Sequence, residues 1–412
     1  MYIFKTLVKR LILILLFVLS TVSCNNKKIV QPLVSSSEVV WQYSNYLDDA
    51  HGGNESNFTI SDFSISRIGG SLTFSLVSYP IIGKDYTIVM DKEGVIARIN
   101  STTKKADWKS IPEHKSQFSR SYLNGGLAQK GEKIYATYGT NLINCIDSKT
   151  GKLIWSKTLQ EAVRAYPIVF KGTVFLQTLN NGLYALDAEN GKVAWYKAGL
   201  DKEVSVVSVI SPILYTNKNW IIIQGSTGNL TIINSKTGFE EWAVDSDDTI
   251  GFDMNFSRKD MLTYQPMIAN DDLYFYSSSG YFYKLNLQDR RIVWKAKFNI
   301  NRPFYISNNN IIAIDEMNNL VAINPKNGAE LWKANLAGYL ENKEKRKKIY
   351  WNSPIVINKN VYVLGSKGEL LRFNLDSGNF VKAIYKMGYG SYIPPIHVGN
   401  KVFIISSKEL LN

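Results

Sequence analysis

The chain has 412 residues, of which 45% are hydrophobic and 12% aromatic, and it carries a formal net charge of +13. This composition excludes an intrinsically disordered chain, because it supplies ample apolar and aromatic surface for a large core. The basic excess is dispersed over many loops, which indicates solvation or attraction to an anionic surface.

The first 23 residues are predicted to be a secretion signal. A nine-residue apolar run, residues 11–19, is too short to span a bilayer, and it follows the basic residues Lys5, Lys9 and Arg10. Small residues then precede Cys24, and this pattern resembles the signal of a bacterial lipoprotein, with Thr21 in place of the usual leucine. We expect residues 1–23 to be cleaved, Cys24 to carry acyl chains such as palmitate, and 24–37 to form a lipidated tether. An ordinary cleaved signal with an incidental cysteine is the alternative, and export in either form excludes nucleic acid as a partner.

A predicted strand and a long excursion precede the repeats. Residues 37–43 (SEVVWQY) include Trp41 and are typical of a single β-strand that has no partner strand nearby in the sequence. Residues 44–78, which include Asp48 and His51, are expected to form an excursion before the first repeat.

A nine-residue unit recurs through the rest of the chain. Its clearest copy is DSKTGKLIW, residues 147–155. Asp147 is suited to capping a tight turn, Gly151 to the positive φ that closes it, and the final tryptophan to filling a gap between stacked layers. Two copies depart at the glycine position, where they have Lys104 and Arg290. Six copies end in tryptophan, at spacings of 47, 40, 47, 52 and 38 residues: Trp108, Trp155, Trp195, Trp242, Trp294 and Trp332.

Each repeat predicts four short strands joined by Gly- and Asn-rich turns. A supersecondary unit repeated every 40 to 50 residues or so is typical of a β-propeller. Seven complete blades, the seventh ending in Lys382 in place of tryptophan, are followed by an eighth that opens at 395–405. We predict that residues 37–43 complete this last blade, because a closed ring leaves no open sheet edges. The predicted fold is all-β, an eight-bladed β-propeller over residues 38–412 whose last blade is closed by an N-terminal strand.

Two connections between blades are predicted to bind partners, because the blades themselves are committed to packing. They span residues 198–211 and 246–264. An alternative for 204–209 is that it forms one more β-strand. A dense charge cluster at 341–348 indicates a solvated loop or a contact with anionic lipid or an acidic partner. The residues expected to contact a partner are Val204, Val206, Val207, Ile250, Phe252 and Phe256.

No residue pattern indicates catalysis or a metal site. The three histidines, which are His51, His114 and His397, lie far apart and match no metal-ligand spacing. The pair Asp247 and Asp248 lacks the ligand periodicity of a calcium loop. Cys145 lies in a predicted strand and is expected to be a small buried hydrophobe. We therefore expect no metal, no cofactor and no enzyme activity.

The repeat resembles the tryptophan-docking motif of the PQQ-type eight-bladed propellers, and it lacks the signatures of WD40 and kelch blades. With a lipoprotein signal at Cys24, the whole chain resembles the propeller lipoproteins of the outer-membrane β-barrel assembly machinery. This resemblance implies a non-enzymatic scaffold, anchored by lipid to the periplasmic face of the cell outer membrane. It also implies binding to the POTRA domains of the barrel-inserting subunit and help in delivering nascent outer-membrane proteins.

The resemblance also assigns the two connections to partner binding. In that family, apolar residues there act together with an arginine and with carboxylates. Here Val207 stands at the arginine position, and Met261 and Thr263 stand at the acidic positions. Two rival functions remain open. One is a propeller lipoprotein that binds another envelope protein or a glycan. The other is a PQQ-dependent dehydrogenase, whose relatives often use an adjacent cysteine pair that this sequence lacks.

Overall fold

The computed structural model describes the chain from Phe58 to Ile405, with internal gaps. Among these residues, no helix is long and apolar enough to cross a membrane. The described residues are 58–60, 63–68, 78–91, 94–103, 105–112, 125–199, 211–225, 230–244, 264–277, 280–300, 302–307, 310–340, 349–366, 368–384, 396–398 and 401–405.

The described residues form eight four-stranded sheets, or blades, and one short 3-10 helix, η1 (Leu336–Tyr339). Blades 1 to 4 take their strands in chain order. Blade 1 consists of β3 (Ile81–Ile82), β4 (Tyr86–Met90), β5 (Ile96–Asn100) and β6 (Ala106–Ser110), and blade 2 of β7 (Gly126–Lys130), β8 (Lys133–Thr137), β9 (Leu142–Asp147) and β10 (Leu153–Thr158). Blade 3 consists of β11 (Ile168–Phe170), β12 (Thr173–Gln177), β13 (Leu183–Asp187) and β14 (Val193–Lys197), and blade 4 of β15 (Ile213–Tyr215), β16 (Trp220–Gln224), β17 (Leu230–Asn234) and β18 (Glu240–Val244).

Blades 5 to 7 follow the same order, and blade 8 combines the two ends of the chain. Their strands are β19 (Met267–Ala269), β20 (Asp272–Tyr276), β21 (Tyr281–Asn286), β22 (Arg291–Lys297); β23 (Tyr305–Ile306), β24 (Ile311–Ile314), β25 (Asn319–Ile323), β26 (Glu330–Asn335); β27 (Ile355–Ile357), β28 (Asn360–Leu364), β29 (Leu370–Asn374), β30 (Phe380–Ile384); and β1 (Phe58–Ile60), β2 (Phe63–Ile68), β32 (Lys401–Ile405), β31 (Ile396–Val398).

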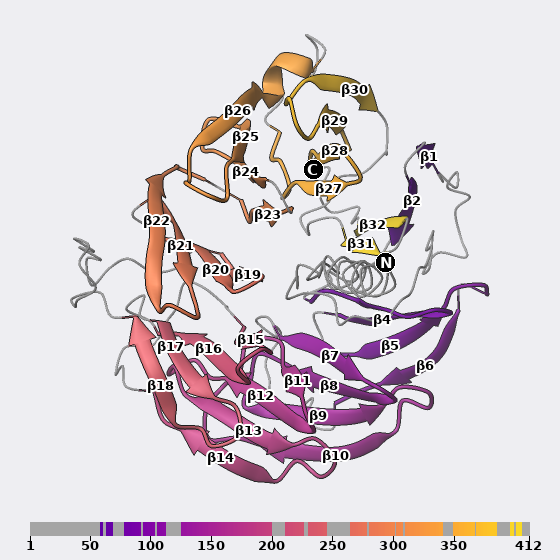
Figure 1. Ribbon diagram of the computed structural model, residues 1–412. Helices are drawn as coiled ribbons and strands as arrows, with labels where there is room; N and C mark the ends of the chain where they lie inside the picture. Colours follow the sequence, from indigo (N-terminus) through magenta and orange to yellow (C-terminus); the bar gives the residue numbers. More distant parts are fainter. Residues whose placement is uncertain are drawn as a thin grey trace, which may run out of the picture.

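The blades follow one another around a ring (Figure 1). In blades 1 to 7 the first strand lies toward the centre and the fourth at the periphery, and in blade 8 β31 lies toward the centre and β1 at the periphery. Neighbouring strands in blades 1 to 7 run antiparallel. The turns between first and second strands and between third and fourth strands therefore lie on one face of the ring, which we call the turn face. The turns between second and third strands lie on the opposite face with the connections between blades, and we call it the connection face.

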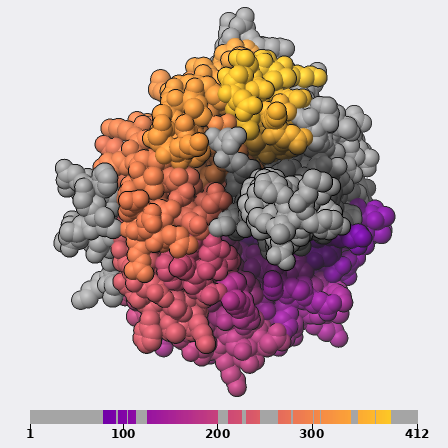
Figure 2. All heavy atoms as spheres, in the orientation of Figure 1, coloured from indigo at the N-terminus to yellow at the C-terminus, as the bar shows by residue number. Residues whose placement is uncertain are grey.

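The core is a series of layers between consecutive blades. The middle strands are covered on both sides, so their residues are buried without alternation, as in β16. The fourth strands face solvent on one side, so exposed and buried residues mix, as in β10. One layer joins blades 4 and 5 through Ile222 and Phe275, and another joins blades 6 and 7 through Ile312 and Val363. Figure 2 shows the blades packed side by side as spheres.

The N-terminal part of the chain closes the ring, as predicted, but through different residues. β2 pairs with β32 in parallel, with Ile65 opposite Val402, and β1 pairs with β2 at the outer edge. These two strands lie within 44–78, so our expectation of an excursion there was wrong. The predicted strand 37–43 with Trp41 lies outside the described residues. The structure confirms an all-β, eight-bladed propeller whose last blade is completed from the N-terminal side.

Candidate functional site

Consecutive blades are joined by the tryptophans of the repeat. These tryptophans lie in fourth strands, and the rings of five of them pack against the glycine of the turn between the third and fourth strands of the next blade. At four junctions the indole N–H donates to a backbone carbonyl of that turn, which satisfies a polar group that water reaches poorly. Four such bonds run from Trp108 to Ser148 (3.2 Å), Trp155 to Ala188 (3.1 Å), Trp294 to Pro325 (3.1 Å) and Trp332 to Leu375 (3.0 Å).

The glycine of the repeat is required for two reasons at once. Gly191 has φ +71°, which L side chains rarely adopt, and a Cβ added there would lie 2.6 Å from Cε3 of Trp155. Gly378 meets Trp332 in the same way, with 2.5 Å to the indole ring. The turn therefore supplies the flat surface on which the ring of the preceding blade lies.

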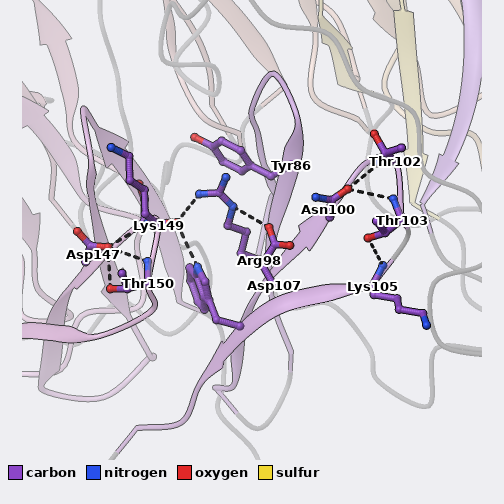
Figure 3. Close-up of polar contacts among 12 residues, drawn as sticks. Tyr86, Arg98, Asn100, Thr102, Thr103, Lys105, Asp107, Asp147, Lys149 and Thr150 are labelled. Atoms are coloured by element: carbon purple, nitrogen blue, oxygen red, sulfur yellow. Dashed lines mark hydrogen bonds and ion pairs between the residues drawn. The ribbon is translucent and has the colours of Figure 1, made fainter.

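The carbonyl that receives the indole also accepts a second side-chain donor. At the junction of blades 1 and 2, Ser148 O accepts from Arg98 Nη1 at 2.7 Å as well as from Trp108 (Figure 3). Arg98 is held by an ion pair with Asp107 (3.2 Å) and lies 4.0 Å from the centre of the Tyr86 ring. Three other junctions use a different donor for the same purpose: Tyr135 to Ala188 (3.1 Å), Lys284 to Pro325 (3.2 Å) and Asn310 to Leu375 (3.3 Å).

One junction is built differently. Arg290 takes the glycine position of blade 5, with φ +56°. Its guanidinium lies 5.8 Å from the Trp242 ring centre and 5.9 Å from that of Trp220. Trp242 packs edge-on against Trp220, and its buried Nε1 finds no acceptor among the described residues. With Arg290 at the glycine position, the indole of Trp242 is not hydrogen-bonded to the turn. It instead packs against Trp220, and the Arg290 guanidinium lies close to both rings.

This difference predicts unequal effects of the same substitution. Trp332→Phe removes a hydrogen bond and should lower the free energy of unfolding by about 1 kcal/mol. Trp242→Phe removes an N–H without an acceptor and should change it by no more than about 0.5 kcal/mol. Both variants lose the same ring volume, so each controls for packing in the other. Denaturant unfolding measures both, and equal losses would contradict the assigned hydrogen bond.

The two connections predicted to bind partners end side by side. Residues 198–211 lead from β14 to β15, and residues 246–264 lead from β18 to β19, so their described ends lie on the connection face. Gln265 joins their ends: its Oε1 accepts from Ser211 N at 2.9 Å, and its Nε2 donates to Ser211 O at 2.9 Å. Ser211 is 1% exposed, so both bonds satisfy backbone groups that water does not reach. This pair of bonds fixes one end of each connection against the other.

All six predicted partner-binding residues lie outside the described part of the chain, as does the predicted lipidation site Cys24. Val204, Val206 and Val207 fall within 200–210, and Ile250, Phe252 and Phe256 fall within 245–263, so their contacts remain predictions. Sequence reasoning missed Gln265, which stands immediately before Pro266, at the position that opens the inner strand of each blade.

Removing the Gln265 amide should therefore have a measurable cost. Gln265→Leu leaves the buried N–H and C=O of Ser211 without their partner, and we expect a loss of about 2–3 kcal/mol of unfolding free energy. Gln265→Glu keeps an oxygen that accepts from Ser211 N–H, so its free energy of unfolding should fall by less. Urea unfolding compares the two variants, and a glutamate variant less stable than the leucine variant would argue against this arrangement.

Two features of the described residues bear on metal binding and on thiol chemistry. Among them, no group of three or more His, Cys, Asp and Glu side chains is placed to hold a metal ion. Cys145 is fully buried between strands, and burial raises the pKa of its thiol to about 12, which leaves it protonated and unreactive at neutral pH. The expectation that Cys145 is a small buried hydrophobe is confirmed.

The comparison with known families decides the identity. The family described as "Outer membrane protein assembly factor BamB" matches residues 92–303 and 301–411, which is most of the chain. The chain belongs to the BamB family.

Relatives of this BamB family member have low identity over most of their length. A protein of Rickettsia prowazekii is 26% identical over 388 residues, 90% of each chain. The outer membrane protein assembly factor BamB of Moranella endobia is 22% identical over 345 residues, which cover 82% of this chain and 85% of that protein. The family match and these relatives agree with the predicted resemblance to the assembly-machinery lipoproteins.

Solved structures share the fold of this BamB family member. The crystal structure of BamB from Moraxella catarrhalis superposes with a TM-score of 0.62 at 16% identity, over 80% of this chain and 93% of that one. A quinohemoprotein alcohol dehydrogenase from Comamonas testosteroni gives 0.60 at 12% identity, over 81% and 70%. At such identities the likeness shows the fold alone, so BamB proteins and quinoprotein dehydrogenases share this propeller.

Proposed function

We propose that this BamB family member is a non-enzymatic scaffold for outer-membrane protein assembly. It would bind the POTRA domains of the barrel-inserting subunit and help nascent outer-membrane proteins to reach that subunit. Cleavage after residue 23 and acylation of Cys24 would anchor it to the periplasmic face of the outer membrane. The family match over most of the chain is the observation that carries this proposal.

The joined ends of the two connections support the assignment of the partner-binding surface. A partner that contacts both connections needs them at a fixed separation, because ordering two independent loops on binding costs conformational entropy. The reciprocal bonds between Gln265 and Ser211 fix that separation before binding. Blades 3 to 5 on the connection face are therefore our proposed docking surface for the POTRA domains.

Substitutions in the second connection test the proposal. Phe252→Ser together with Phe256→Ser removes two apolar side chains, and truncating a central aromatic contact typically weakens binding about tenfold or more. We expect that loss in the affinity for a purified POTRA fragment, measured by calorimetry, with an unchanged melting temperature. Loss of folding would show as a lower melting temperature, so the two effects are separable.

Met317→Ser is the matched control. Met317 is 77% exposed in the turn between β24 and β25, on the connection face but in blade 6. Its substitution should leave the affinity within about twofold, as for a rim residue. Equal affinities of all three proteins would show that the connection at 246–264 is not the interface. Retention of PQQ with Ca²⁺ at one equivalent would favour the dehydrogenase function over the scaffold.

A further inference from the structure

The two faces of the ring differ in charge. In the described turns of blades 1 to 7, the turn face carries eleven basic and six acidic residues. The described turns and connections of the opposite face carry two basic and five acidic residues. Among the described turns and connections, the basic excess is thus gathered on the turn face.

Within the turn face, blades 2 to 4 form a continuous arc. Lys133 of blade 2 forms an ion pair with Glu189 of blade 3. Lys171 of blade 3 donates to Asn219 of blade 4 at 2.8 Å. These contacts tie the turns of three consecutive blades together, and the three blades lie side by side (Figure 2). We call this surface the basic arc.

The carboxylates of the basic arc are already engaged. Glu132 pairs with Lys149, and Glu240 pairs with Lys197 at 3.4 Å. Asp147 accepts from the Thr150 hydroxyl and from the backbone N–H groups of its own turn at 3.0 and 2.7 Å, and these bonds lower the pKa of its carboxyl. Four exposed lysines of the arc form no ion pair with any described residue: Lys152, Lys192, Lys218 and Lys236.

Exposed apolar side chains lie among these lysines. Each of the three blades has an exposed apolar residue at the end of the turn between its third and fourth strands or directly after it. Leu153 follows Lys152 and is 41% exposed, Val193 follows Lys192 and is 42% exposed, and Phe239 follows Gly238 and is 77% exposed. Lysines beside exposed apolar and aromatic residues are the composition of surfaces that bind a membrane interface, where the ammonium groups meet phosphates and the apolar groups enter the acyl boundary.

We propose that the basic arc docks against an anionic phospholipid bilayer. The four unpaired lysines would neutralise lipid phosphates, and Phe239 would enter the interface between head groups and acyl chains. This orientation turns the connection face, with the joined ends of its two connections, away from the lipid and toward the aqueous space. The proposal does not rest on partner binding, because the bilayer contact needs no second protein.

Flotation of the full chain with phospholipid vesicles tests this docking. We compare vesicles of phosphatidylcholine with vesicles that also contain phosphatidylglycerol, and native protein with variants on the same vesicles, so that the contribution of the N-terminal segment with Lys5, Lys9 and Arg10 is common to all proteins. Native protein should bind the anionic vesicles more tightly, and the difference should fall with added salt. Reversing Lys152, Lys192, Lys218 and Lys236 to Glu should weaken binding to the anionic vesicles about tenfold or more, because each basic residue near the surface contributes.

A second quadruple variant provides the matched control. Lys84, Lys105, Lys326 and Lys359 are exposed turn-face lysines of blades 1, 6 and 7, and their reversal to Glu changes the net charge by the same amount. This variant should bind the anionic vesicles no more than about threefold more weakly, because only the net charge of the whole protein changes. Phe239→Ser should weaken binding even at high salt, which the lysine variants do not test. Circular dichroism melting confirms that each variant is folded.

The two quadruple variants distinguish lipid docking from attraction by net charge. Selective loss in the arc variant supports the proposal. Equal loss in both variants would show that net charge alone attracts the chain. Equal binding of native protein to both kinds of vesicle would overturn lipid docking. In that case, a requirement for the same four lysines in capturing an acidic protein would assign the surface to a protein partner.

Discussion

Gly191→Ala is expected to lower the free energy of unfolding by about 3 kcal/mol, an unusually large effect for one added methyl group. The positive φ of Gly191 costs an L residue about 1–2 kcal/mol. The new Cβ would also lie 2.6 Å from Trp155. The indole must move, and overpacking of this kind typically costs about 1–3 kcal/mol. Its hydrogen bond to Ala188 O weakens at the same time.

Gly172→Ala separates the two causes. Gly172 has φ +76°, close to that of Gly191, but a Cβ there would meet no atom within 4 Å. The free energy of unfolding of Gly172→Ala should therefore fall only by the cost of the positive φ, about 1–2 kcal/mol. Denaturant unfolding of the two variants gives the difference, which measures the docking of Trp155. Equal losses would mean that the glycine of the repeat serves only the turn.

Deleting residues 58–68 is expected to abolish the cooperative unfolding of the intact ring. The deletion removes β1 and β2, and with them the pairing of Ile65 and Val402 that joins the two ends of the chain. Blade 8 would keep only β31 and β32, and an isolated two-stranded sheet is marginal in water. We expect the free energy of unfolding to fall by about 5 kcal/mol or more, an effect larger than that of most single substitutions.

Deletion of residues 37–43 is the comparison that distinguishes the two closing segments. If β1 and β2 close the ring, this second deletion should shift the melting temperature by only a few degrees, about 1 kcal/mol in energy. Calorimetry and limited proteolysis report both variants. A larger effect from deleting 37–43 than from deleting 58–68 would favour closure by the strand that contains Trp41.

Much of the fold could be predicted from the sequence because the repeat carries its own register. Each Asp or Asn, each glycine and each tryptophan has a local reason to be where it is, so the turn at 147–155 and its copies are predictable. The closing strands are not, because β2 and β32 pair over more than three hundred residues and neither has a docking motif. Trp41 favours 37–43 as the closing strand, whereas residues 58–68 show no turn signal of the repeat.

The candidate site was predictable only in outline. Residue spacing locates the two connections, since insertions between blades stand out against a regular period. It gives no sign that Gln265 joins them, because a glutamine before a proline looks the same whether its amide meets solvent or a buried backbone group. Arg290 is visible in the sequence as a departure from glycine, but its contact with two tryptophans depends on side chains from two different blades.

The parallel pairing of β2 with β32 sets the order of events when the chain is made. β2 is made more than three hundred residues before its partner β32 (Lys401–Ile405). Blades 1 to 7 need only local contacts and can form as the chain emerges, while contacts over such a sequence separation form slowly. Until β32 is made, β2 exposes an unpaired edge that invites aggregation. A product truncated before Lys401 lacks the partner strand of β2 and cannot close the ring.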